Sequence, residues 1–344
     1  MDTYELIEAL CGQSGIPSRE HPVMDAIRAQ FKDFPCAVDP LGGLHVQLRA
    51  PQRGEKTLLL EAHADRVGLV VTDYLQGGFV RVAKAGGADE AALMGSRIRI
   101  QSRDGSWLTG VIGLPFPYPA KPHNSAPASE YKMPQVGELF VDTGLAEPEK
   151  QIARGAQCLL EGDVRRLFGT RVSAPALDNR AGCAALILAA QMLADQPLGV
   201  GLRLLFASRE EVGGAGAKAG AFYAEPDYAV VVDTGFAISP DVDKKDGVEM
   251  GAGPEIDCSP LLDEKMYALM LRCAQEQGIP HQPFVLAGRS TGTDADGVAV
   301  TGPGVRTALL SVPVRFMHHP AEVCDLTDIE STAALLAAFA KEVR

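Results

Sequence analysis

Acidic and histidine side chains recur where segments of this 344-residue chain end or begin. In "LLLEAHAD" a histidine and an aspartate follow an apolar run, and in "LRLLFASREE" two adjacent glutamates do. The aspartate of "LDNRAG" stands just before a predicted helix, another aspartate ends "YAVVVD", and two histidines follow "VPVRFM". Carboxylates and imidazoles without thiolates suit zinc, cobalt or manganese, so the pattern predicts a metal site. The residues are His63, Asp65, Asp178, Glu210, Glu211, Asp233, His318 and His319.

The number of these ligands exceeds what one catalytic ion with an open position needs. It suits two ions about 3.5–4 Å apart that share a bridging carboxylate. His63 and Asp65 are two residues apart and face the same side of an extended chain, so Asp65 can accept a hydrogen bond from the second ring nitrogen. Glu210 and Glu211 are neighbours and point to opposite faces of a strand. We therefore expect one of them to bind an ion and the other to act as a general base.

The elements that must position these side chains alternate between strands and helices. Apolar strands are predicted at 58–60, 200–207 and 227–235, and helices are predicted at 179–195, 260–277 and near the C-terminus. This alternation predicts an α/β fold with a sheet flanked by helices. Polar residues at the carboxyl ends of such strands meet at one edge of the sheet, where α/β enzymes keep their sites.

Residues 69–168 differ from the rest of the chain in their sequence pattern. Short strand-like pieces such as "GFVRVA" and "SRIRIQS" are separated by glycine, aspartate and proline, which is typical of a small all-β unit. The segment 115–134 is proline-rich and is predicted to be an exposed loop. We therefore expect residues 1–68 and 169–344 to form one catalytic domain that is interrupted by an inserted β domain at 69–168.

Composition limits the class of protein. The net charge of −12 argues against a nucleic-acid partner, which needs a basic face. No apolar run reaches the roughly 18 residues of a membrane span, and the acidic N-terminus does not resemble a signal peptide. Seven cysteines without a C-x-x-C pair indicate reduced thiols rather than zinc ligands. These features predict a cytoplasmic protein without a membrane partner.

The ordered set of motifs resembles the M42 family of dinuclear metalloaminopeptidases. The matching segments are "EAHADRVG", "GGADEAAL", "ELFVDTG", "SAPALDNRAGC", "SREEVGGAGA", "VVDTG", "STGTDADG" and "VPVRFMHHPAEV". The resemblance implies a zinc-peptidase-like mixed sheet flanked by helices, with an inserted small PDZ-like β domain used for oligomerisation. It also implies two divalent ions per subunit (zinc or cobalt), cleavage of N-terminal residues from short peptides, and a homo-oligomer, usually a dodecamer.

The resemblance also assigns roles to the motif residues. Glu210 matches the general base, and Asp65 matches the carboxylate that supports a metal-binding histidine. Five positions match metal ligands, with a carboxylate shared by both ions: Asp178 as the bridge, His63 and Asp233 on one ion, and Glu211 and His318 on the other.

Two positions depart from the family pattern. Arg66 stands where the family usually has glutamate, and we expect its guanidinium to bind substrate and favour acidic N-terminal residues. The alternative is an internal ion pair between Arg66 and an acid such as Glu61. The last motif reads "HHP" instead of His-Ser-Pro, so His318 is favoured by alignment and His319 stays open.

Other functions were weighed against the metallopeptidase. "GRSTG" at 288–292 matches a serine nucleophile elbow, so Ser290 with His318 predicts a serine hydrolase. The α/β-hydrolase order along the chain needs an acid between the serine and the histidine. Asp294 and Asp296 lie too near Ser290 to be obvious partners. A non-catalytic metal-binding scaffold is a further alternative, because Arg66 brings a cation beside the site. A glycosidase would need a carboxylate pair that works without metal.

Overall fold

The computed structural model describes residues 1–113 and 135–344. The proline-rich segment 115–134, predicted to be a loop, lies outside the described residues. The chain divides into two compact units, each treated separately below. The larger unit comprises residues 1–66, 163–317 and 321–344, and the smaller unit comprises 67–162 and 318–320.

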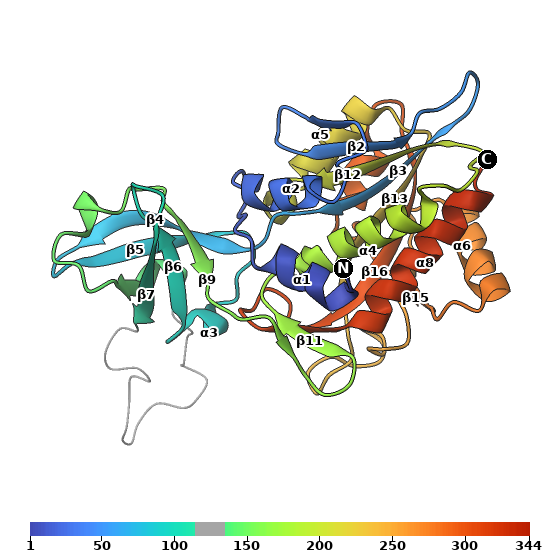
Figure 1. Ribbon diagram of the computed structural model, residues 1–344. Helices are drawn as coiled ribbons and strands as arrows, with labels where there is room; N and C mark the ends of the chain where they lie inside the picture. The colour runs from blue at the N-terminus through green and yellow to red at the C-terminus, as the bar shows by residue number, and fades with distance from the viewer. Residues whose placement is uncertain (114–134) are drawn as a thin grey trace. The chain divides into compact units, whose positions relative to one another are not determined.

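A mixed sheet of eleven described strands forms the centre of the larger unit (Figure 1). Its order is β1-β2-β12-β3-β13-β16-β17-β11-β10, and β14 pairs with both β15 and β16. The four central strands β12, β3, β13 and β16 run parallel. The strands are β1 (Cys36–Val38), β2 (Leu44–Arg49), β3 (Thr57–His63), β10 (Arg165–Arg166), β11 (Arg171–Ala174), β12 (Gly201–Ala207), β13 (Tyr228–Phe236), β14 (Glu255–Cys258), β15 (Gln282–Val285), β16 (Arg306–Arg315) and β17 (Glu322–Asp325).

The central strands are apolar along nearly their whole length. The side chains at 58–60 in β3 and at 230–232 in β13 are fully buried. Continuous apolar runs are typical of parallel strands that are covered on both faces. Because parallel strands end at the same edge, β3, β12 and β13 bring the residues that follow them into one region.

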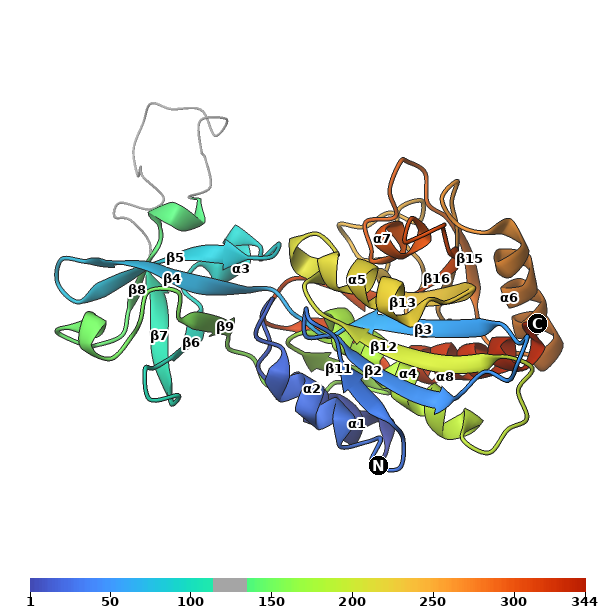
Figure 2. The ribbon, with the colours of Figure 1, turned by 90° about the horizontal axis from the view of Figure 1, so that it is seen from above.

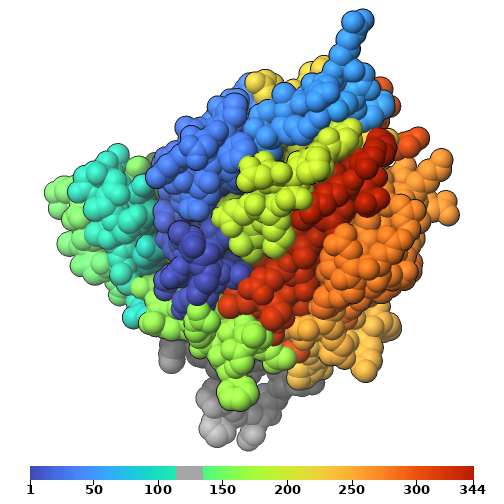
Figure 3. Space-filling model, turned by 45° about the vertical axis from the view of Figure 1, so that its right-hand side comes forward, coloured from blue at the N-terminus to red at the C-terminus, as the bar shows by residue number. Residues whose placement is uncertain are grey.

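Helices cover both faces of this sheet (Figure 2). One layer is α1 (Thr3–Cys11), α2 (His21–Arg28), α4 (Leu177–Leu193), α6 (Glu264–Gln277) and α8 (Leu326–Glu342), and its apolar side chains join the main core. Figure 3 shows α4, α8 and α6 side by side on the surface of this layer. The other layer is α5 (Ala215–Ala224) and α7 (Ala295–Ala299), which pack over a separate apolar cluster.

The smaller unit is a closed barrel with its own core. Six described strands follow the order β4-β5-β8-β7-β6-β9 and pair antiparallel. Alternate side chains, among them Val71, Val82, Ile98 and Ile112, fill the interior. The elements are β4 (Gly68–Leu75), β5 (Phe79–Ala85), α3 (Glu90–Leu93), β6 (Arg97–Gln101), β7 (Trp107–Gly113), β8 (Phe140–Asp142) and β9 (Gln157–Leu160). The predicted fold class, a helix-flanked mixed sheet with an inserted small β unit, is confirmed.

No helix within the described residues has both the length and the apolar character needed to cross a membrane.

Candidate metal centre

His63, the last residue of β3, lies at the centre of a buried group of carboxylates. Its Nε2 is 3.3 Å from Oδ1 of Asp178 and 3.4 Å from Oδ1 of Asp233. One ligand atom from each of the three residues lies within 4.8 Å of the others, and all three side chains are buried. The structure therefore brings three of the predicted ligands together in a geometry that one divalent cation fits.

Strand register and one amide side chain produce this grouping. Val231 of β13 pairs with Glu61 of β3, so two residues further along these parallel strands Asp233 and His63 face the same side. The side-chain amide of Asn179 donates to the carbonyl of Val232 at 2.7 Å, which ties the start of α4 to β13. Asp178 lies next to this amide and has non-helical φ and ψ angles, so it departs from the regular course of α4.

Asp65 faces the other ring nitrogen of His63. Its Oδ1 is 3.5 Å from His63 Nδ1, and its side chain is fully buried. The same carboxylate accepts hydrogen bonds from the backbone N–H groups of Glu210 at 3.0 Å and Glu211 at 3.2 Å. Asp65 thus faces the ring and also positions the two glutamates, a second role that the sequence did not reveal.

Glu210 and Glu211 lie on a short 3₁₀ turn, Glu210–Val212, instead of on a strand. β12 ends at Ala207, and Arg209 has a positive φ of 63°, so the chain leaves the sheet before the glutamates. Adjacent residues of a 3₁₀ turn point about 120° apart, because the turn has three residues. Glu210 Oε2 is 4.0 Å from His63 Nε2, whereas a Glu211 carboxylate oxygen lies within 4.8 Å of one from Asp178.

The electrostatics of the group favour a bound cation. Burial would lower the pKa of His63, but Asp233 and Asp178 hold it well above its usual range. Burial raises the pKa of Glu210 to about 7, and the carboxylates of Asp233 and Asp178 add to that rise. Buried carboxylates are costly unless a positive charge neutralises them. A nitrogen and oxygen donor set without thiolates fits a divalent ion such as zinc or cobalt.

His318 follows β16 and groups with the smaller unit. Within that unit its Nδ1 is 3.1 Å from the carbonyl oxygen of Gly87, and a Cβ at Gly87 would lie 2.9 Å from the ring. Glycine is therefore required for this close approach. An Nδ1–H that donates to this carbonyl directs the lone pair to Nε2, the atom that a metal-binding histidine uses.

Arg66 and Ser290, the other residues singled out from sequence, lie in different surroundings. Arg66 is only 2% exposed. Its positive charge counteracts part of the rise in the pKa of the Cys11 thiol, which burial brings to about 12. Arg66 is thus an interior residue. The Ser290 hydroxyl donates to the carboxylate of Asp296, and within the described residues it is not hydrogen-bonded to a histidine, the base that a serine hydrolase needs.

Glu61 and Asp294 form a buried acidic pair beside the centre that the sequence analysis did not assign to the site. Both are at most 1% exposed. Burial and the neighbouring Asp294 raise the pKa of Glu61 well above its usual range. Burial does the same for Asp294, and Glu210 adds to it. The one signal in the sequence is a carboxylate inside the apolar run "LLLEA".

Comparison with solved structures identifies the class of protein. The chain superposes on an aminopeptidase from Desulfurococcus kamchatkensis with a TM-score of 0.90 and 30% identity, covering 99% of this chain and 95% of that one. It also superposes on the TET1 peptidase of Pyrococcus horikoshii, described as assembling into a tetrahedron or a large octahedral shell. That TM-score is 0.84 at 29% identity, over 99% of this chain and all of the other. The fold is that of an aminopeptidase.

The sequence comparisons identify the family. The family model described as M42 glutamyl aminopeptidase matches residues 42–335. A lysyl aminopeptidase from Pyrococcus furiosus is 28% identical over 358 residues, which span all of this chain and 98% of the relative. The chain belongs to the M42 peptidase family, and the resemblance inferred from its motifs is confirmed.

Proposed function

We propose that this aminopeptidase removes N-terminal residues from short peptides with the help of two divalent metal ions, zinc or cobalt. The observation that carries the proposal is the buried group of His63, Asp178 and Asp233, whose ligand atoms lie within 4.8 Å of one another. When bound, the ions lower the pKa of a water molecule and polarise the scissile carbonyl. Side chains of this protein carry out the other steps of the reaction.

The proposed ligand sets share one carboxylate. Asp178 has oxygens within ligand distance of His63 and Asp233 on one side and of Glu211 on the other, which supports it as the bridge. His63 and Asp233 would then hold the first ion, and Glu211 and His318 would hold the second. The Nδ1 contact of His318 with the Gly87 carbonyl leaves Nε2 for a metal and supports His318 as a ligand.

Glu210 is the proposed general base. Its carboxylate lies 4.0 Å from His63 Nε2, and its backbone N–H is held by Asp65. It takes the proton from the attacking water and passes it to the leaving amine. Asp65 keeps the ring of His63 oriented and fixes the turn from which Glu210 projects.

Substrate preference stays a prediction. The matching family model is named for a glutamyl aminopeptidase and the Pyrococcus furiosus relative for a lysyl aminopeptidase, so these names do not decide the preferred residue. We propose acidic N-terminal residues, as expected from the sequence, and the name of the matching family model supports this choice. The burial of Arg66 supports an internal role for its guanidinium more than a contact with substrate.

The proposed assembly is a cytoplasmic homo-oligomer, of dodecamer type, in which the inserted β unit contributes subunit contacts. The shell-forming structural relative supports an oligomer. None of the seven cysteines is in a disulfide.

Removal of metal tests the proposal directly. After dialysis against a chelator, we expect the hydrolysis of aminoacyl p-nitroanilides to be lost, and zinc or cobalt to restore it. Metal content per subunit, measured in parallel, should rise to two on reconstitution. Activity that survives metal removal and is lost in Ser290→Ala would replace the metallopeptidase with a serine hydrolase.

A further inference from the structure

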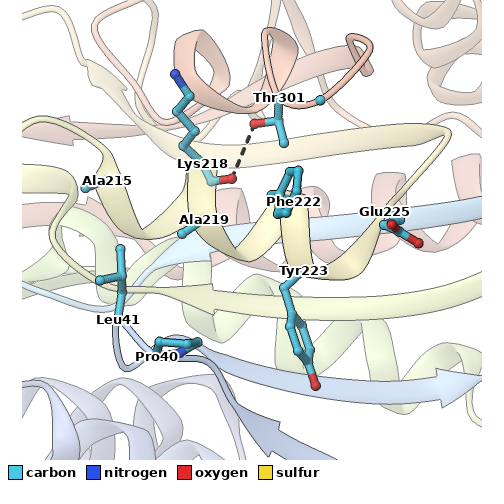
Figure 4. Close-up of a pocket in the computed structure, with 10 residues that line it drawn as sticks. Pro40, Leu41, Ala215, Lys218, Ala219, Phe222, Tyr223, Glu225 and Thr301 are labelled. Carbon is cyan, nitrogen blue, oxygen red and sulfur yellow. Dashed lines mark hydrogen bonds between the residues drawn. The ribbon is translucent and has the colours of Figure 1, made fainter.

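The outer face of α5 carries a stripe of three side chains, Lys218, Phe222 and Glu225. Lys218 and Phe222 are four residues apart and lie on one side of the helix, and Glu225, three residues further, caps its C-terminal end. Figure 4 shows Lys218 toward one end of α5, Glu225 at the other, and Phe222 between them. Phe222 is 67% exposed and the neighbouring Tyr223 is 53% exposed. A cation, an exposed aromatic ring and a carboxylate thus follow one another along an exposed helix.

Two hollows border Phe222. One has a volume of about 690 Å³ and is lined by Pro40 and Leu41 together with Ala215 and Ala219 of α5. The other, of about 290 Å³, is lined by Pro226, Pro303 and Val305 among others, and both include Phe222. Tyr223 packs on the ring of His45 with 4.8 Å between the ring centroids, and this contact holds Tyr223 in place beside Phe222. The surface offers apolar space beside an apolar ring.

The two charges of the stripe do not stabilise the helix that carries them. Lys218 is near the N-terminal end of α5 and Glu225 caps its C-terminal end, opposite to the arrangement that the helix dipole favours. Glu225 also has a positive φ of 48°, at a cap position where glycine is the usual residue. Neither side chain forms an ion pair with another of the described residues. Their placement has no explanation inside one subunit.

The stripe is complementary to itself under a two-fold rotation. With a rise of 1.5 Å per residue, Lys218 and Glu225 are about 10 Å apart along the axis, and Phe222 lies within about 1 Å of their midpoint. Two antiparallel copies of α5 would therefore place each lysine opposite the partner's glutamate while the two phenylalanine rings meet at the axis. Self-complementarity of this kind defines an isologous interface.

We propose that the Lys218–Phe222–Glu225 stripe is a two-fold contact site for a second copy of this chain. Burial of the aromatic ring supplies the affinity, and the hollows beside it receive the partner's ring. The two ion pairs set the antiparallel register, because opposite charges favour one alignment and like charges oppose the others. This contact lies on the larger unit and is independent of the inserted β unit.

Charge exchange tests the register. Lys218→Glu and Glu225→Lys should each weaken association by about tenfold or more, because like charges then face each other across the two-fold axis. The double variant Lys218→Glu with Glu225→Lys should restore association to near the wild-type level. Molar mass is measured by light scattering over a concentration series, with circular dichroism as the folding check. Lys244→Glu, at another exposed lysine of the same unit, is the matched control and should leave the mass unchanged.

Several outcomes would overturn the proposal. They are a wild-type monomer at all concentrations, single reversals that leave the mass unchanged, and a double variant that stays dissociated. Because the readout is size, it is independent of whether the peptidase mechanism is correct.

A crosslink at position 222 provides a second test. With a short bismaleimide, Phe222→Cys should give covalent dimers, because each new thiol lies near its symmetry mate. Val285→Cys, at a position that is 70% exposed, and the wild type should stay uncrosslinked. A stripe that binds short peptides instead of a second copy would leave Phe222→Cys monomeric, and this result would also overturn the proposal.

Discussion

Glu210 and Glu211 are identical in chemistry, but their carboxylates face different partners. Glu210 lies near His63, and Glu211 lies near Asp178. We predict that Glu210→Gln lowers turnover by about 10²–10⁴-fold, because the amide cannot take a proton from water. Metal content should stay near normal, because the proposed ligands are untouched. Steady-state kinetics measure the turnover, and metal analysis of the same preparation measures the bound metal.

The possible results separate three roles for Glu210. Loss of bound metal in Glu210→Gln would make this residue a ligand, and unchanged turnover would remove it from the mechanism. A wild type that binds metal without hydrolysing any aminoacyl substrate would support the non-catalytic scaffold.

Arg66 tests whether the departure from the family motif affects specificity. A panel of Glu-, Asp-, Leu-, Ala- and Lys-p-nitroanilides measures the preference of the wild type, which we propose to be acidic. Because Arg66 is buried, we expect Arg66→Glu to lower the free energy of unfolding by about 3–5 kcal/mol. The ratio of kcat/KM for Glu and Leu substrates should stay unchanged. The milder Arg66→Gln serves as the control, and a shift of this ratio in a folded variant would show that Arg66 contacts substrate.

At the scale of elements, β14 carries a pair of buried acids that links stability to pH. Asp257 accepts a hydrogen bond from the Ser311 hydroxyl of β16 at 2.7 Å. Burial and the neighbouring Asp257 raise the pKa of Glu255 to about 9, and burial raises the pKa of Asp257 to about 7. Asp233 at the end of β13 adds to the rise for Asp257. The folded chain thus holds protons that the unfolded chain releases at ordinary carboxyl pKa values.

The sign of the pH dependence follows from these raised pKa values. The contribution of this pair to the free energy of unfolding is largest below the ordinary carboxyl range, and it falls as the pH rises toward about 9. Glu255→Gln should flatten this dependence between about pH 5 and 9, because the amide stays neutral and can still donate to Asp257. Urea denaturation at a series of pH values measures the effect. An unchanged slope would mean that other groups cause the dependence.

Some elements were predictable from sequence because their pattern is local. The apolar runs that form β3 and β13 predicted buried strands, and the polar residues that end them predicted His63 and Asp233. The turn at Glu210–Val212 was not predictable, because it depends on the positive φ of Arg209. The pairing of Glu61 with Asp294 joins positions far apart in the chain. The strand β10, "RR", has no apolar pattern, so its pairing with β11 in the large sheet could not be predicted from the sequence either.

At the scale of the whole molecule, two separate surfaces are proposed to join subunits. A closed assembly of twelve copies built from dimers needs more than one type of contact. The α5 stripe would supply a two-fold contact on the larger unit, and the barrel of residues 67–162 would supply the other. The barrel has its own apolar core, so its removal should leave the core of the larger unit complete.

We therefore predict that the molar mass of the assembly falls stepwise as the two contacts are removed. In the presence of metal, wild-type protein should give a molar mass near twelve chains by light scattering. Replacement of residues 67–162 by a short linker should leave dimers held by α5, because that contact lies wholly on the larger unit. Lys218→Glu in this shortened chain should then give monomers, whereas Lys244→Glu should not. A sharp monomer peak for wild-type protein at high concentration would refute the assembly, and a shortened chain that keeps the wild-type subunit number would show that the barrel makes no necessary contact.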